Sequence, residues 1–306
     1  MLSFRHHAVS IAAIFLALAV GVVLGSQTRS DGFIPGKGDR PGSDALIAEN
    51  DRLTAQLRAA DDFLSGSSGK LLAGNLAGRS VLVFAAPDAD SADVDSVTAA
   101  LLAAGAAVTG RVTLAEAFTD SGESDRLRTA LTNVVPAGGQ LRIDAPDQGS
   151  LAGDLLGQVL LTDPATGQPR GTDPERGLAL ETLRGGGFLT SDVQGPAQLS
   201  VVVAGDGARA PESNRGTILA RFAAGLRAHS AGVVLAGRYG AAEGPGAIAV
   251  ARSEAPLATI TTVDNVDHQI GRITTVLGLT EQLNGGTGRY GTGATATSLT
   301  VVAMPH

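Results

Sequence analysis

The sequence predicts an α/β fold in which a mainly parallel sheet is flanked by helices. Two observations predict it: short apolar, β-branched segments alternate with longer helical segments, and these strand-like segments are apolar throughout. Strands of that kind are buried on both faces, as in a parallel sheet covered by helices. An apolar content of 43% in 306 residues is enough for such a core. One transmembrane helix and one short coiled-coil helix are predicted to precede this domain.

The composition excludes several classes of function. The net charge of −7 argues against nucleic acid as a partner, because binding to phosphates needs a basic face. Cysteine is absent, which excludes disulfides, thiolate metal ligands and cysteine nucleophiles. Composition therefore indicates an architecture but no particular activity.

The amino-terminal segment 1–26 is predicted to be a membrane anchor or a signal segment. Residues 8–25 contain no charged side chain. As a helix this run would cover about 27 Å, close to the ~30 Å hydrocarbon core of a bilayer. The positions expected in the membrane include Ala8, Leu16, Val20 and Leu24. The alternatives are a signal peptide cleaved before Ser26 and a buried terminal helix.

The orientation of this segment follows from the charges that flank it. Arg5 and the α-amine precede the apolar run and favour a cytoplasmic N-terminus. We therefore expect a membrane-anchored protein of the cell envelope with an exported C-terminal domain.

A helix over 43–64 is predicted after a Gly/Pro-rich linker over 27–42. Its apolar residues alternate by four and three, the spacing of a coiled-coil seam, and a buried Asn in such a seam pairs best with its own copy. The seam positions expected to mediate self-association are Leu46, Asn50, Leu53 and Leu57. The alternative is a single amphipathic helix packed on its own domain, since three heptads are marginal alone. A Gly/Ser-rich hinge is predicted over 65–78.

The globular domain is predicted over 79–284. Its first strand, 80–85, ends before Pro87, and its last helix, 269–283, stops at an Asn-Gly-Gly signal. Further strands are predicted over 107–114, 199–204, 231–237, 247–251 and 259–263, and further helices over 91–104, 123–134, 150–161, 174–186 and 213–229. Residues 285–306 are predicted to form a loose Gly-rich tail with an edge strand over 298–303.

Gly205-Asp206-Gly207 follows a predicted strand and loosely fits a dinucleotide-binding fingerprint. In that fingerprint the helix opens at the glycines, whereas here it is expected only after Pro211. The next strand ends in Gly237-Arg238, without the acidic residue that would hold a ribose. We interpret the segment as a glycine turn.

Four carboxylates follow the first strand. They belong to Asp88, Asp90, Asp93 and Asp95. The spacing of an EF-hand calcium loop is not present. Acidic residues at a helix start are favoured by capping and by the helix dipole, so we interpret the cluster as structural.

The candidates for a metal site are few and weak. Asp264, Asp267 and His268 precede the last helix and would offer two carboxylates and an imidazole, although Asp267 also suits an N-cap. Met304 and His306, at the end of the chain, are further weak candidates. No catalytic or cofactor-binding residue is predicted, and we expect the protein not to be an enzyme.

Several segments together resemble the mycobacterial copper transport protein B (MctB) family. They are the apolar segment 7–26, RLTAQL at 52–57, DQGSLAGDLLG at 147–157, ARFAAGL at 220–226, VLAGR at 234–238, TVDNVD at 262–267, GRIT at 271–274, LNGG at 283–286 and YGTG at 290–293. The resemblance implies an actinobacterial envelope protein described as pore-forming in the outer membrane and needed for copper efflux. Copper would then be the transported ion, but the resemblance implies no residue-level copper site.

A channel role has a physical requirement. One apolar helix cannot line an aqueous pore, so a channel would need the N-terminal helices of several copies. The alternative function is a non-enzymatic structural or interaction module of the envelope with a degenerate α/β domain. An enzyme acting on a nucleotide or phosphate substrate would rest only on the Gly205 turn and the acidic groups.

Overall fold

The computed structural model describes residues 41–136, 147–207 and 214–301. The predicted membrane positions Ala8, Leu16, Val20 and Leu24 and the metal candidates Met304 and His306 lie outside the described residues. Within the described ranges, no helix is both long and apolar enough to cross a bilayer. The chain divides into two units, 1–56 and 57–306.

A seven-stranded sheet forms the centre of the second unit, in the order β3-β2-β1-β4-β5-β6-β7. Its strands are β1 (Ser80–Ala85), β2 (Ala107–Leu114), β3 (Leu189–Ser191), β4 (Leu199–Val203), β5 (Gly232–Ala236), β6 (Thr261–Val263) and β7 (Arg289–Tyr290). All neighbouring pairs are parallel except β2 and β3. The predicted mainly parallel sheet is confirmed.

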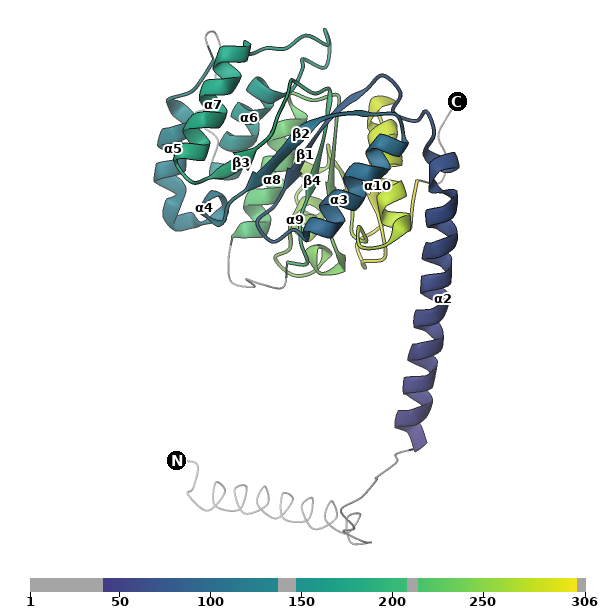
Figure 1. The fold of residues 1–306 in the computed structure, drawn as a ribbon. Helices are drawn as coiled ribbons and strands as arrows, with labels where there is room; N and C mark the ends of the chain where they lie inside the picture. The colour runs from purple at the N-terminus through teal and green to yellow at the C-terminus, as the bar shows by residue number, and fades with distance from the viewer. Residues whose placement is uncertain (1–40, 137–146, 208–213, 302–306) are drawn as a thin grey trace, which may run out of the picture. The chain divides into compact units, whose positions relative to one another are not determined.

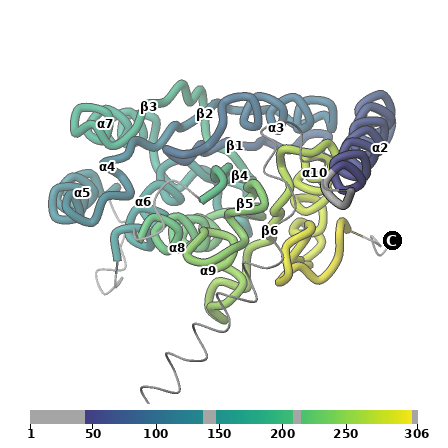
Figure 2. The backbone as a smooth tube through the Cα atoms, turned by 90° about the horizontal axis from the view of Figure 1, so that it is seen from below, coloured from purple at the N-terminus to yellow at the C-terminus, as the bar shows by residue number. Residues whose placement is uncertain are grey.

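Helices cover both faces of this sheet, as the prediction requires (Figure 1). The α-helices are α2 (Pro41–Leu72), α3 (Ser91–Ala103), α4 (Glu116–Thr119), α5 (Ser124–Thr132), α6 (Gln148–Leu160), α7 (Asp173–Gly185), α8 (Arg215–Arg227), α9 (Ala247–Ser253) and α10 (Gln269–Leu283). Figure 2 shows α3 and α10 on one face and α6, α8 and α9 on the other. The sheet is therefore the middle layer of three.

Strand β1, in the interior of the sheet, contributes to a separate core on each face. Val81 and Val83 pack in the cluster that includes α3 and α10, whereas Leu82 and Phe84 pack in the cluster that includes α6 and α8. All four side chains are fully buried. Successive side chains of a strand point to opposite faces, so a strand covered on both sides must be apolar at every position.

Helices α6 and α8 approach so closely that glycine is required between them. A Cβ at Gly153 would lie 2.3 Å from the Phe222 carbonyl oxygen, and one at Gly149 would lie 2.2 Å from the Ile218 carbonyl oxygen. Such distances lie far inside van der Waals contact, so any side chain would force the helices apart. The glycine spacing in DQGSLAGDLLG thus serves helix packing.

The structure corrects the predictions for residues 247–251 and 65–78. Residues 247–251, predicted as a strand, belong to α9; a short apolar run does not distinguish a strand from a buried helix by periodicity. The hinge predicted over 65–78 is helical in its first half, because α2 continues to Leu72. Leu72, the last residue of α2, is fully buried in the core, and this burial favours continuing the helix despite its glycines.

The tail predicted over 285–306 is partly built into the sheet. Strand β7 pairs with β6, and Tyr290 is 7% exposed. Its hydroxyl donates to Glu281 Oε1 at 2.8 Å. The edge strand predicted over 298–303 is not a strand in its described part, 298–301, where Ser298 forms an isolated bridge with Tyr290.

Candidate functional site

The carboxyl ends of β1, β4, β5 and β6 meet at one edge of the sheet, and the loops that follow them carry the polar candidates. In open α/β sheets, ligands bind at this edge where the strand order reverses. Here the reversal lies between β1 and β4. A cavity of about 150 Å³ lies there, lined by Asp88, Ala89, Asp90, Gly205, Asp206, Gly207 and Arg238.

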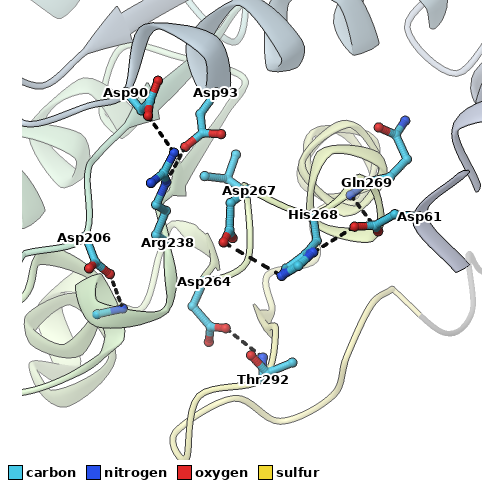
Figure 3. Close-up of polar contacts among 12 residues, drawn as sticks. Asp61, Asp90, Asp93, Asp206, Arg238, Asp264, Asp267, His268, Gln269 and Thr292 are labelled. Carbon is cyan, nitrogen blue, oxygen red and sulfur yellow. Dashed lines mark hydrogen bonds and ion pairs between the residues drawn. The ribbon is translucent and has the colours of Figure 1, made fainter. Parts of the chain in front are cut away.

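Arg238 is the cation among the described residues that line this cavity, and its guanidinium points towards two carboxylates (Figure 3). Its Nε donates to Asp93 Oδ2 at 2.7 Å, and its Nη2 donates to Asp90 Oδ2 at 2.7 Å. The hydrogen bond to Asp93 raises the pKa of Arg238. Arg238 therefore ties the loop after β5 to the start of α3.

The four aspartates after β1 each have a separate role. Asp88 accepts a hydrogen bond from the Gly205 amide at 3.2 Å, and Asp90 caps α3 by accepting from the Ala92 amide at 2.9 Å. Asp93, which is 3% exposed, and Asp95 pair with Arg238 and Arg111 respectively. These partners support the structural interpretation of the cluster, because each carboxylate is bound by a backbone amide or by an arginine of the protein.

The segment Gly205-Asp206-Gly207 brings neighbouring loops together. A Cβ at Gly205 would lie 2.1 Å from the Asp88 carbonyl oxygen, and Gly207 has a φ of +70°. Asp206 Oδ1 accepts from the Gly240 amide at 2.9 Å. Helix α8 begins at Arg215, well after the glycines, so this geometry supports a glycine turn over a dinucleotide-binding loop.

Asp264 is buried in an ion pair. It is 0% exposed, and Arg252 Nη1 donates to its Oδ2 at 2.7 Å. Its Oδ1 accepts from the Thr292 amide at 2.7 Å. Figure 3 shows Asp264 pointing towards Thr292 and away from Asp267 and His268. The structure therefore does not bring the three predicted metal candidates together.

Asp267 and His268 do lie side by side, with Asp61 as a third neighbour. The distance between His268 Nε2 and Asp267 Oδ2 is 3.8 Å, and His268 Nδ1 donates to Asp61 Oδ2 at 2.8 Å. Asp61 Oδ1 also accepts from the Gln269 amide at 3.2 Å. The expectation that Asp267 caps α10 is thus wrong: the N-cap is His268, and Asp61 of α2 supplies the carboxylate.

The ranges that the structure describes contain no group of three or more His, Asp or Glu side chains that could hold a metal ion. Sequence reasoning assigned no role to Asp61, Arg238 or Arg252. Arg238 had a usable signal, because it follows β5 almost directly and so lies at the ligand-binding edge. Asp61 had none, since its contact joins positions 207 residues apart.

The predicted self-association positions lie in α2 and are exposed. Leu46 is 72%, Leu53 53% and Leu57 48% exposed. Asn50 accepts a hydrogen bond from Thr54 Oγ1 at 3.3 Å. In this single chain, the apolar side chains of the predicted seam therefore remain in contact with solvent.

Comparison with known proteins gives one consistent result. The family described as "Copper transport outer membrane protein, MctB" matches residues 1–301. The copper transporter MctB of Mycobacterium tuberculosis (strain ATCC 25618 / H37Rv) is 41% identical over 312 residues, covering 98% of this chain and 99% of the relative. That of Mycobacterium leprae (strain TN) is 42% identical over 324 residues, with the same coverage. The chain therefore belongs to the MctB family of copper transport proteins.

Proposed function

We propose that this chain acts in copper efflux at the cell envelope, as an oligomer assembled through α2. The observation that carries the proposal is the family match, which runs from the first residue to residue 301. Relatives named copper transporters align over 98% of the chain, so the N-terminal segment, α2 and the α/β domain are all shared. We therefore assign to this chain a role that, in the relatives, can depend on all three parts.

Self-association through α2 is supported by its exposed apolar side chains. Exposed leucines at four-and-three spacing lose contact with water when a second helix packs against them, which contributes about 25 cal/mol per Å² of buried apolar area. Asn50 lies within the same seam, and an Asn there favours a defined register because it pairs with its counterpart. The occupant we propose is therefore a second copy of α2.

Membrane attachment is supported by the uncharged run over 8–25, which has the length of a bilayer-spanning helix. One such helix cannot enclose an aqueous path for a charged ion. Oligomerisation through α2 would gather the N-terminal segments of several copies. This is the route by which we propose that the chain contributes to a channel.

The function is tested by complementation. In a strain lacking the gene, the wild-type gene is expected to restore growth on copper and to lower cellular copper content. A variant with Leu46→Asp and Leu53→Asp, which places charges in the seam, is expected to lose this rescue and to have the mass of a monomer in light scattering. The matched control carries Ala48→Asp and Ala55→Asp, at exposed positions on the side of the helix opposite the predicted seam.

Two results would contradict the proposal. If deletion leaves copper tolerance and copper content unchanged, the copper role is wrong. If the seam variant keeps the mass of the wild type, assembly through α2 is wrong, whatever the copper phenotype. Fractionation of the envelope with N-terminal sequencing of the mature chain tests the anchor, because cleavage before Ser26 would remove it.

The second candidate function is a non-enzymatic interaction module of the envelope. The exposed apolar face of α2 favours it too, because this face would serve another protein as well as a second copy. Copurification of a stoichiometric partner together with an absent copper phenotype would select this candidate.

A further inference from the structure

A second cavity, distinct from the one around Arg238, lies beside β6 and β7. Its volume is about 200 Å³. Two arginines and three threonines contribute to its lining, namely Arg252, Arg289, Thr262, Thr287 and Thr297. None of the described residues that line it carries a carboxylate, although the chain as a whole has a net charge of −7. The cavity is thus a cationic site in an acidic protein.

Among the described residues that line this cavity, Arg289 is the cation without a side-chain partner. Its side chain has no hydrogen-bond or ion-pair partner in the described part of the chain, and it is only partly exposed. A guanidinium that is partly removed from water loses hydration, and a partner with negative charge restores that loss. Arg289 is therefore available to a ligand, unlike Arg238 in the first cavity.

The neighbouring Arg252 already has its counter-charge. Besides the ion pair with Asp264, its Nε donates to Thr262 Oγ1 at 2.9 Å and its Nη2 donates to the Tyr290 carbonyl oxygen at 2.8 Å. Burial lowers the pKa of Arg252, Asp264 opposes this effect, and repulsion from Arg289 adds to the lowering. Two guanidiniums thus share one described carboxylate, which leaves one positive charge unbalanced.

The lining also supplies a hydroxyl donor and an apolar wall. Thr287 is exposed, and its hydroxyl has no partner among the described residues, whereas Thr297 Oγ1 donates to the Arg289 carbonyl oxygen at 3.0 Å. Ile260 contributes an apolar side chain to the lining of the same cavity. An arginine fork with a nearby hydroxyl suits the two oxygens of a carboxylate or a phosphate.

We propose that this cavity binds a small oxyanion, a carboxylate or a phosphate, with Arg289 as its anchoring cation and Thr287 as a second donor. This proposal does not depend on the proposed role in copper efflux, so the two can be tested separately. Bound oxyanion would balance the charge of Arg289 and relieve its repulsion with Arg252. Because both β7 and the segment after it contribute to the lining, the ligand would also tighten the C-terminal end of the sheet.

The test titrates the purified full-length chain in neutral detergent with inorganic phosphate and, separately, with acetate. We expect saturable binding by calorimetry and a rise in melting temperature with at least one of them, and competition between the two when both bind. Arg289→Gln is expected to weaken binding at least 10-fold. Arg128→Gln is the matched control, because Arg128 on α5 is also partly exposed and has no side-chain partner in the described residues.

Three outcomes would overturn the proposal: no saturable binding of either anion to the wild type, equal binding by the Arg289→Gln variant, or an equal loss in the control. Circular dichroism checks that each variant is folded. If Arg289→Gln does not fold, Thr287→Val replaces it. That variant keeps the shape of the side chain and is expected to weaken binding several-fold, and unchanged binding would again contradict the site.

Discussion

Asp61 on α2 and His268 immediately before α10 form a hydrogen bond of 2.8 Å between Oδ2 and Nδ1. The other carboxylate oxygen of Asp61 accepts from the Gln269 amide, one of the amides that the start of a helix leaves unpaired. One carboxylate from the C-terminal half of α2 thus satisfies the first turn of α10. The interaction joins the C-terminal part of α2 to the start of α10, although the two lie far apart in the sequence.

Replacing Asp61 by Asn is expected to lower the free energy of unfolding by about 1 kcal/mol, because the charge that favours both hydrogen bonds is lost. The effect stays small since both side chains are about one-third exposed. Urea denaturation measures it, and hydrogen exchange at Gln269 should become faster. Asp62→Asn, at the next and exposed position, is the control. Equal effects of both variants would contradict a specific role of Asp61.

Replacing Gly153 by Ala is expected to destabilise the protein by about 3 kcal/mol. The new Cβ would lie 2.3 Å from the Phe222 carbonyl oxygen, and neither backbone moves without opening the contact between α6 and α8. Gly177→Ala is the control within a helix. A Cβ there meets open space, so that change should stabilise by about 0.5–1 kcal/mol. Changes of the same sign at both positions would refute this explanation.

Replacing Asp264 by Asn is expected to cost about 3–5 kcal/mol, because Arg252 would be left as a buried, uncompensated charge. The side chains of this pair are 1% and 0% exposed. Glu49→Gln serves as the comparison, since it breaks an exposed pair with Arg52 and should leave stability nearly unchanged. A small effect at Asp264 in urea denaturation would show that the pair is not a determinant of stability.

The Asp163 carboxyl is expected to stay ionised at low pH. A hydrogen bond from Arg170, followed by those from the Thr166 and Ala165 amides, lowers its pKa to about 2. Since the ordinary value is about 3.9, the stabilisation is present above that pH and is lost as pH falls through about 2. At pH 3 a ¹³C-carboxyl NMR measurement should find Asp163 mostly ionised, whereas a carboxyl with the ordinary pKa would be mostly protonated.

The Arg170→Gln variant provides the internal check on that titration. Loss of the guanidinium removes the largest cause of the shift, so the midpoint of Asp163 should rise towards the ordinary value. A wild-type midpoint near pH 3.9, or a midpoint that does not respond to the variant, would exclude Arg170 as the cause.

Most of the α/β domain could be predicted because its signal is local. The strand 80–85 coincides with β1, and the helices predicted over 91–104 and 174–186 correspond to α3 and α7 within one residue at each end. Two short strands were not predicted: β3 has three residues and β7 has two, too few for a periodicity to appear. The strand predicted over 247–251 was wrong because a buried helix and a buried strand are equally apolar.

The candidate site was less predictable than the fold. The sequence placed Asp264, Asp267 and His268 in one short segment, but chain direction after β6 sends Asp264 into the core towards Arg252. Burial of that pair depends on residues from α9, β6 and the segment after β7, which adjacent positions in the sequence do not reveal. The pairing of Arg238 with Asp90 and Asp93 likewise spans more than a hundred residues of chain.

By itself, the sequence determined the layered α/β architecture, the apolar N-terminal run and the family, because hydrophobic pattern and residue identity are properties of the chain alone. The tertiary structure alone decided which charges neutralise one another and which remain available. In the structure Asp264 pairs with Arg252, and Asp61 accepts a hydrogen bond from the first turn of α10. Arg289 has no side-chain partner among the described residues. The physical reason is that electrostatic and hydrogen-bonding interactions act over a few ångströms of space, whatever the separation along the chain.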